Sequence, residues 1–132
     1  MLNEAFHAVV WLDHDEAKIF HFSSSEVERL LIRARDSDHV ASQAAGPNDG
    51  SHGAGRHSYY QRIADAIADA GAVLITGPAG AKTELLTYVA AHDAALLPRI
   101  ADVQTLEPSH DAALLALARE YFRRDDRAHP RR

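Results

Sequence analysis

Residues 72–86, AVLITGPAGAKTELL, decide the fold predicted for this chain. The stretch begins with a short apolar run, which is typical of a buried strand. Gly77 to Ala81 then form a turn, and a helix is expected from about Lys82 to His92. A strand that leads through a tight turn into a helix is the repeating unit of α/β domains. The rest of the chain is therefore interpreted around this unit.

Residues 6–22, FHAVVWLDHDEAKIFHF, predict two strands joined by a polar turn. The first, residues 6–13, is almost entirely apolar, as in a central strand buried on both faces. The second, residues 17–22, alternates, so that Lys18, Phe20 and Phe22 share one face. A third strand is expected over residues 27–34. Three consecutive strands predict an antiparallel section of the sheet.

Residues 36–57 show little apolar periodicity and contain four glycines, which predicts a long glycine-rich loop. Ser58 and Gln61 match a capping box, so a helix is expected to begin there. A further strand is expected near residues 100–106, and Pro108 and Ser109 would begin the last helix.

The predicted order is β-β-β-α-β-α-β-α, an α/β arrangement with a mixed five-stranded sheet and helices on its faces. This is the ribonuclease H-like three-layer layout. It gives one domain over residues 1–124 with a long loop over 36–57, followed by a basic tail over 125–132.

The composition favours a folded protein of a reducing compartment. The 132 residues are 46% hydrophobic and 25% charged and include no cysteine, so neither a disulfide framework nor a thiolate metal site is possible. The N-terminus lacks the pattern of a signal peptide, and no apolar run is long enough to span a membrane. We therefore expect a cytoplasmic location and no membrane partner.

Charge is unevenly distributed along the chain. The formal net charge is −5, but residues 119–132 contain six arginines against three acidic residues. An acidic body repels phosphate, so contact with nucleic acid is expected at the arginine-rich end, which includes Arg123 and Arg124, or at a local patch.

Two catalytic motifs are matched only in part. The turn at residues 77–83 resembles a phosphate-binding P-loop, but Ala81 replaces the glycine before Lys82 and the loop is one residue short. We therefore interpret it as a strand-to-helix turn, with Lys82 available to an anion at the helix N-terminus. Ser109, His110 and Asp111 are adjacent, which does not allow a catalytic triad. Ser109 is instead expected to cap a helix.

No metal or other cofactor is predicted. His52 and His57 lie near Asp49, but nothing in the sequence fixes their geometry as a metal site. Asp13 ends the first strand, where ribonuclease H-like nucleases keep a metal ligand. Two-metal chemistry needs further carboxylates, so Asp13 is interpreted as a polar residue that closes the strand.

The segment GPAGAKTELLTYV, residues 77–89, resembles the strand-turn-helix signature in the middle domain of class I peptide-chain release factors and of Pelota-type surveillance proteins. The chain also resembles a group of short bacterial translational machinery proteins that consist of this domain alone. In the release factors, a loop ending in two glycines and a glutamine promotes peptidyl-tRNA hydrolysis. This chain keeps His52, Gly53 and Gly55, but Arg56 and His57 stand where the second glycine and the glutamine would be.

The resemblance implies a ribosome- or tRNA-associated protein without hydrolase activity and without catalytic residues. The expected contacts are His52, Gly53, Gly55, Arg56, His57, Lys82, Arg123 and Arg124. Two alternatives remain open at this point: a homo-oligomeric interaction module with no RNA contact, and a small-molecule or phosphate-binding enzyme that uses the 77–83 turn.

Overall fold

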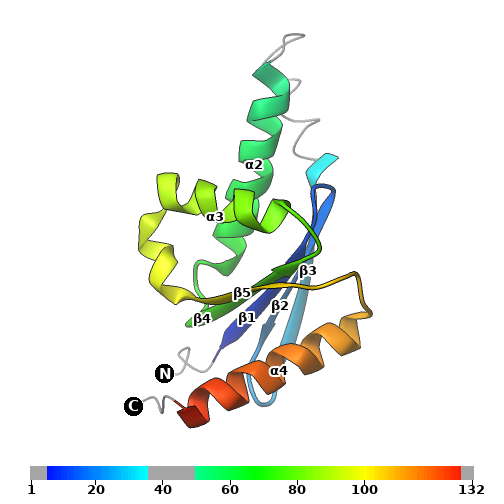
Figure 1. The fold of residues 1–132 in the computed structure, drawn as a ribbon, viewed down its shortest axis with the longest axis vertical. Coiled ribbons are helices and arrows are strands. Elements are labelled where there is room, and N and C mark those ends of the chain that lie inside the picture. The colour runs from blue at the N-terminus through cyan, green and yellow to red at the C-terminus, as the bar shows by residue number, and fades with distance from the viewer. Residues whose placement is uncertain (1–5, 36–49, 129–132) are drawn as a thin grey trace.

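The computed structural model describes residues 6–35 and 50–128 (Figure 1). Five strands form one sheet, and the helices pack on its two faces. The elements are β1 (His7–Leu12), β2 (Glu16–Phe22), β3 (Val27–Arg33), α2 (Gly50–Ile67), β4 (Ala72–Gly77), α3 (Ala81–His92), the 3-10 helix η2 (Ala94–Arg99), β5 (Ile100–Thr105) and α4 (Asp111–Ala128).

The sheet is mixed and has the strand order β3-β2-β1-β4-β5. β1 pairs antiparallel with β2 and parallel with β4, so it joins the two halves of the sheet. β2 and β3 are antiparallel, whereas β4 and β5 are parallel. The predicted mixed five-stranded, ribonuclease H-like sheet is confirmed.

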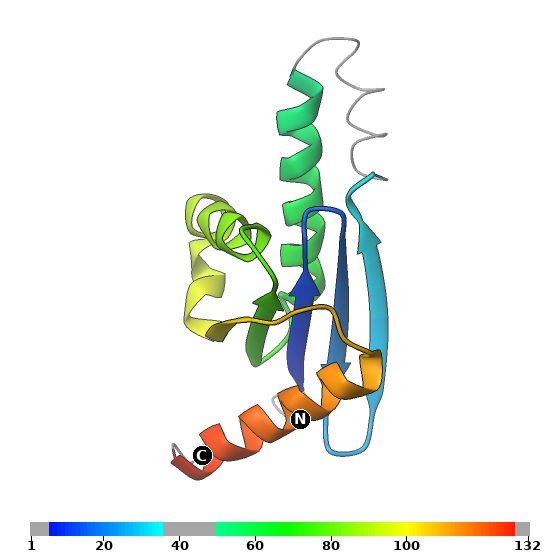
Figure 2. The ribbon, with the colours of Figure 1, turned by 45° about the vertical axis from the view of Figure 1, so that its right-hand side comes forward.

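Two hydrophobic cores lie on opposite faces of this sheet (Figure 2). One is formed by α2 and α3 against alternate residues of β1, β2 and β4, among them Val10, Ile19 and Ile75. The other is formed by α4 against the remaining alternation, including Trp11 and Phe20. The face assignment predicted for β2 is therefore confirmed, because residues two apart in a strand point the same way.

The turn between β1 and β2 is fixed by Asp13. Its carboxylate Oδ1 accepts hydrogen bonds from the backbone N–H groups of Asp15 at 2.8 Å and Glu16 at 2.9 Å. Such short aspartate-to-backbone bonds stabilise tight turns. Asp13 is thus a residue that closes a strand, as the sequence predicted.

The structure corrects the start of two helices. α2 begins at Gly50, so residues 50–57 are helical and the predicted loop over 36–57 is wrong there, while residues 36–49 lie outside the described part of the chain. Ser58 lies inside α2, so the capping box is also wrong. The sequence did not indicate this helix, because glycines lower the helix propensity of its first turns and no apolar stripe marks them.

α4 begins at Asp111 instead of at Pro108 and Ser109. The first helical hydrogen bond runs from the N–H of Leu114 to the carbonyl of His110 at 3.0 Å, which makes His110 the residue before the helix. The Ser109 hydroxyl reaches only the carbonyl of Glu107, at 3.5 Å. Ser109 is therefore not the helix cap that the sequence suggested.

Across the described residues, no helix combines the length and the apolar character needed to cross a bilayer.

Candidate functional site

The predicted contact residues of the glycine-rich stretch lie in the N-terminal half of α2. His52, Gly53, Gly55 and Arg56 are helical, and the side chains of His52 and Arg56 lie outside the described part of the structure. Figure 2 shows that this half of α2 extends beyond the sheet and the other helices. His57 is exposed where α2 meets α3. The residues that the sequence singled out are thus carried on a projecting helix.

Lys82 lies in the first turn of α3, and its ammonium group is bound locally. Its Nζ donates a hydrogen bond to the carbonyl of Ala79 at 2.8 Å. Glu84 also lies in this first turn, and its negative charge opposes binding of an anion there. The strand-to-helix turn is confirmed, but its surroundings do not resemble a phosphate cradle.

Gly77 explains why this turn begins with glycine. A Cβ atom at this position would lie 2.2 Å from the carbonyl oxygen of Leu12, where real contacts are never so short. By contrast, a Cβ at Gly80 would meet nothing within 4 Å. Close packing of β4 against the end of β1 therefore requires Gly77 and leaves Gly80 unconstrained.

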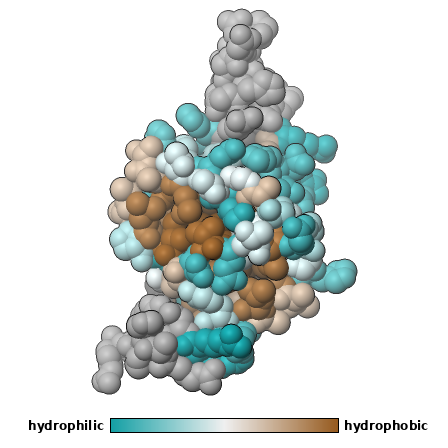
Figure 3. Space-filling view, viewed as in Figure 1, coloured by the Kyte–Doolittle hydropathy of each residue, from teal (hydrophilic) through white to brown (hydrophobic). Residues whose placement is uncertain are grey.

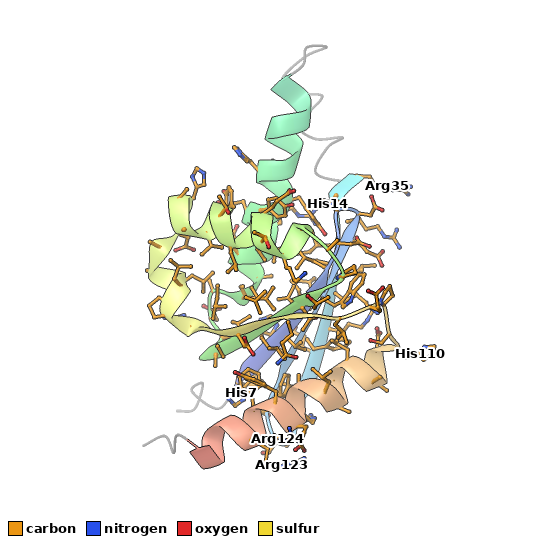
Figure 4. All side chains as sticks on the ribbon, viewed as in Figure 1. His7, His14, Arg35, His110, Arg123 and Arg124 are labelled. Atoms are coloured by element: carbon orange, nitrogen blue, oxygen red, sulfur yellow. The ribbon has the colours of Figure 1, made fainter. Side chains whose placement is uncertain are left out.

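Arg123 and Arg124 lie on α4, at the opposite end of the molecule from the projecting half of α2 (Figure 4). Both are exposed, and both pair with the carboxylate of Glu120; the bond from Arg124 Nε measures 2.8 Å. The predicted contact residues of α2 and those of α4 therefore form two separate groups, and Lys82 on α3 belongs to neither. One RNA phosphate cannot contact both.

The structure reveals a polar cluster between α2, α3 and the β1–β2 turn that the sequence analysis missed. The Tyr60 hydroxyl donates to Glu84 Oε1 at 2.7 Å, and His14 Nε2 lies 3.1 Å from Glu84 Oε2. Glu84 thereby joins two elements far apart in the sequence, while its side chain stays 42% exposed. The carboxylate is therefore held by two contacts and is still partly exposed.

Aromatic rings continue this cluster along the surface between α2 and α3. Tyr88 stacks on His92 with ring centroids 4.3 Å apart, and His57 lies 5.6 Å from Tyr88 and 5.7 Å from His92. Burial raises the pKa of the Tyr88 hydroxyl, as do the charges of Asp65 and Asp93. Tyr88 is therefore a neutral phenol at neutral pH, and its hydroxyl donates to the side chain of Gln61.

Tyr59 connects α2 to the end of β1. Its hydroxyl donates to the carbonyl of Asp13 at 2.9 Å, and the side chain is almost fully buried. Burial and the neighbouring Asp13 carboxylate raise the pKa of Tyr59 far above its usual value. The bond holds the base of α2 against the β1–β2 turn, which orients the projecting half of the helix.

The apparent triad at residues 109–111 has a structural role. The Asp111 carboxylate accepts from Lys18 Nζ at 3.0 Å and from Arg29 Nε at 2.7 Å, which ties the start of α4 to β2 and β3. Within the described residues, no cluster of three or more histidine, aspartate or glutamate side chains is arranged to hold a metal ion.

One sequence signal does point to the cluster between the helices. Glu84, Tyr88 and His92 are spaced by four residues, and this spacing places them on one face of a helix. A carboxylate and two rings on one face would have identified the surface of α3. Its partners His57 and Tyr60 come from another helix, and only the tertiary structure shows that they meet.

No family model matches this sequence. No curated protein matches it with significance either. Solved structures, by contrast, superimpose on this chain. Pelota from Archaeoglobus fulgidus superimposes with a TM-score of 0.59 at 10% identity, over 87% of this chain and 31% of that protein. The archaeal translation termination factor aRF1 superimposes with a TM-score of 0.53 at 13% identity, over 84% of this chain and 32% of that protein. This chain thus spans about a third of the length of these proteins. At such low identity the likeness shows a shared fold.

Proposed function

We propose that this chain is a non-catalytic, ribosome- or tRNA-associated protein that acts in stalled or stress-state translation. The observation that carries the proposal is the projecting half of α2. It bears His52 to His57 on a body whose fold is shared with Pelota and with a translation termination factor. The proposed place of action is the cytoplasm.

The placement of charge supports contact through this helix. The body of the chain is acidic, so a phosphate surface would repel most of it. Arg56 lies in the projecting half of α2, where contact with phosphate would keep the acidic body away. Arg123 and Arg124 would serve as a second contact at the other end of the molecule.

The proposal includes the absence of peptidyl-tRNA hydrolysis. Arg56 and His57 occupy the positions at which the release-factor loop has its second glycine and its glutamine. Neither side chain offers the amide that orients water in that loop. Incubation with peptidyl-tRNA and ribosomes is therefore expected to release no peptide above the rate without the protein.

The main test is sedimentation with ribosomes through a sucrose cushion. The wild-type protein is expected in the ribosomal pellet at about 50 mM salt and to be lost as salt rises to about 200 mM. An Arg56→Glu variant should lose about tenfold in affinity. Arg99→Glu is the matched control, because Arg99 is an exposed arginine on η2 whose guanidinium donates to the carbonyl of Ala68, beyond the C-terminal end of α2 and away from its projecting half.

Two results would remove the proposal. One is wild-type protein that stays in the supernatant even at low salt. The other is an equal loss for the Arg56 and Arg99 variants, which would indicate charge attraction without a site. Concentration-dependent self-association in the first case would favour the homo-oligomeric alternative. Saturable binding of inorganic phosphate that Lys82→Ala abolishes would favour the phosphate-binding alternative.

A further inference from the structure

A groove with a volume of about 800 Å³ lies between α2 and α3, beside the projecting half of α2. It is open along one side, so a side chain or a short extended segment could enter it. Its described lining consists of His57 and Tyr60 from α2 together with Gly80, Thr83, Glu84, Thr87, Tyr88, Ala91 and His92 from the start and body of α3.

The charge of the groove is negative. Glu84 is the acidic residue in the described lining, whose basic side chains are the histidines His57 and His92, with neither lysine nor arginine. Asp65 on α2 and Asp93 after α3 add further negative charge close to Tyr88. A phosphate group would meet repulsion here, whereas a cation would be attracted. The groove therefore differs in chemistry from the contact proposed for Arg56.

Its remaining surface is mainly aromatic and apolar, with two threonines, Thr83 and Thr87. The rings of Tyr60, Tyr88 and His92 follow one another along the groove. Aromatic faces attract ammonium and guanidinium groups. Figure 3 shows hydrophobic surface over α3 and over η2, which is not part of the lining; within the lining, Ala91 is exposed beside the rings. The methylene stem of a lysine or arginine packs well on such a surface while its charged end reaches a carboxylate.

We propose that this groove binds an arginine or lysine side chain from a basic segment of a partner protein. Glu84 is the residue that receives the cation, since its carboxylate is held in place by Tyr60 and His14 and is still exposed in the groove. The aromatic rings receive the aliphatic stem. The inference does not depend on the proposed function: the two sites share His57, but the groove binds a ligand of opposite charge.

The test is fluorescence anisotropy with the full chain and a labelled peptide of about eight residues in which arginine alternates with glycine. The matched probe is the same peptide with citrulline, a neutral isostere, in place of arginine. Saturable binding of the arginine peptide is expected, with binding of the citrulline peptide weaker by about tenfold or more. Equal binding of the two peptides would overturn the proposal.

Variants locate the binding to the groove. Glu84→Gln should weaken the arginine peptide by about tenfold, because the charge of the hydrogen-bond acceptor is lost. Glu26→Gln is the matched control: it removes the same charge from an exposed residue in the β2–β3 turn and should change affinity less than about twofold. Thr87→Lys introduces a cation at an exposed lining position without touching the bonds of Glu84, so it should also weaken binding.

Three outcomes would contradict the assignment. If the Glu26 and Glu84 variants lose affinity equally, the peptide is held by the overall acidic charge. If Thr87→Lys has no effect while Glu84→Gln unfolds the protein, the groove is not the site. If the protein assembles with rising concentration and deletion of residues 129–132 prevents this, the occupant is the basic end of a second copy.

Discussion

Gly77 lies where β4 packs closely against the end of β1, and this packing leaves no room for a side chain at that position. Replacing it with alanine would push a methyl group into the carbonyl oxygen of Leu12, which belongs to a backbone that cannot move without breaking the sheet. We expect Gly77→Ala to lower the free energy of unfolding by about 2–3 kcal/mol, a cost typical of overpacking. Urea unfolding monitored by circular dichroism measures it.

Gly80 is the control for that substitution, three residues along the same turn. Its surroundings are open and its backbone is already helical, with φ −75° and ψ −13°. Gly80→Ala should therefore leave stability unchanged or raise it by about 0.5–1 kcal/mol through the unfolded chain. Equal losses for both alanine variants would show that the packing of Leu12 is not the reason for glycine at position 77.

Asp111 supports a prediction about pH. The hydrogen bond from Lys18, together with the neighbouring Arg29, holds the pKa of this carboxyl below its usual value. A lowered pKa in the folded state means that the ionised form stabilises the fold. This contribution is present above the unfolded pKa of about 3.9 and is lost as pH falls through the lower folded pKa.

Asp111→Asn should accordingly cost about 1 kcal/mol at pH 7, a small value because the carboxylate is partly exposed. The difference from wild type should shrink as pH falls below the unfolded pKa of about 3.9, and should vanish only below the lowered folded pKa. Asp69→Asn, at an exposed position after α2, is the comparison variant. A deficit for Asp111→Asn that persists unchanged in acid would mean that the ion pairs do not contribute.

Among the elements, α2 was the least predictable from sequence. The strands could be predicted because burial requires alternating apolar residues in β2 and continuous apolar runs in β1 and β4. Both patterns are visible in the sequence. The first turns of α2 lack such a pattern, since they project beyond the cores. A helix that packs against little leaves no apolar stripe, and its glycines suggest a loop.

The candidate site was predictable only in part, for a related reason. The chemistry of His52 to His57 could be read from the local sequence. The cluster around Glu84 depends on contacts with His14 and Tyr60, 70 and 24 residues away in the chain. Spacing within α3 indicates that Glu84, Tyr88 and His92 share a face, but it gives no information about which element covers that face.

The glycines of α2 lead to a prediction for the whole element. Each glycine inside a helix costs about 1 kcal/mol relative to alanine. The double change of Gly53 and Gly55 to alanine should therefore increase helical circular dichroism and slow amide hydrogen exchange over residues 51–57. If ribosome association requires this part of α2 to unwind, the same variant binds more weakly although it is better folded. Faster exchange in the double variant would contradict the helical assignment.

At the scale of the whole molecule, the separation of the two basic groups has a measurable consequence. The projecting half of α2 and the end of α4 lie at opposite ends of the body (Figures 1 and 4). In the proposed binding mode, Arg56 would therefore contact a different part of a nucleic acid than Arg123 and Arg124 would. Groups that share no partner act independently in binding.

The expected result is additivity. In the ribosome assay, the loss of binding free energy for Arg56→Ala combined with Arg123→Ala should equal the two single losses added together, within about 0.5 kcal/mol. Each lost phosphate contact should also reduce the slope of log affinity against log salt by about one. Glu120→Gln would strengthen binding, because Glu120 partly neutralises Arg123 and Arg124 in the free protein. Strong coupling between the two ends would instead require the nucleic acid to bring them onto one site, which a rigid sheet between α2 and α4 does not permit.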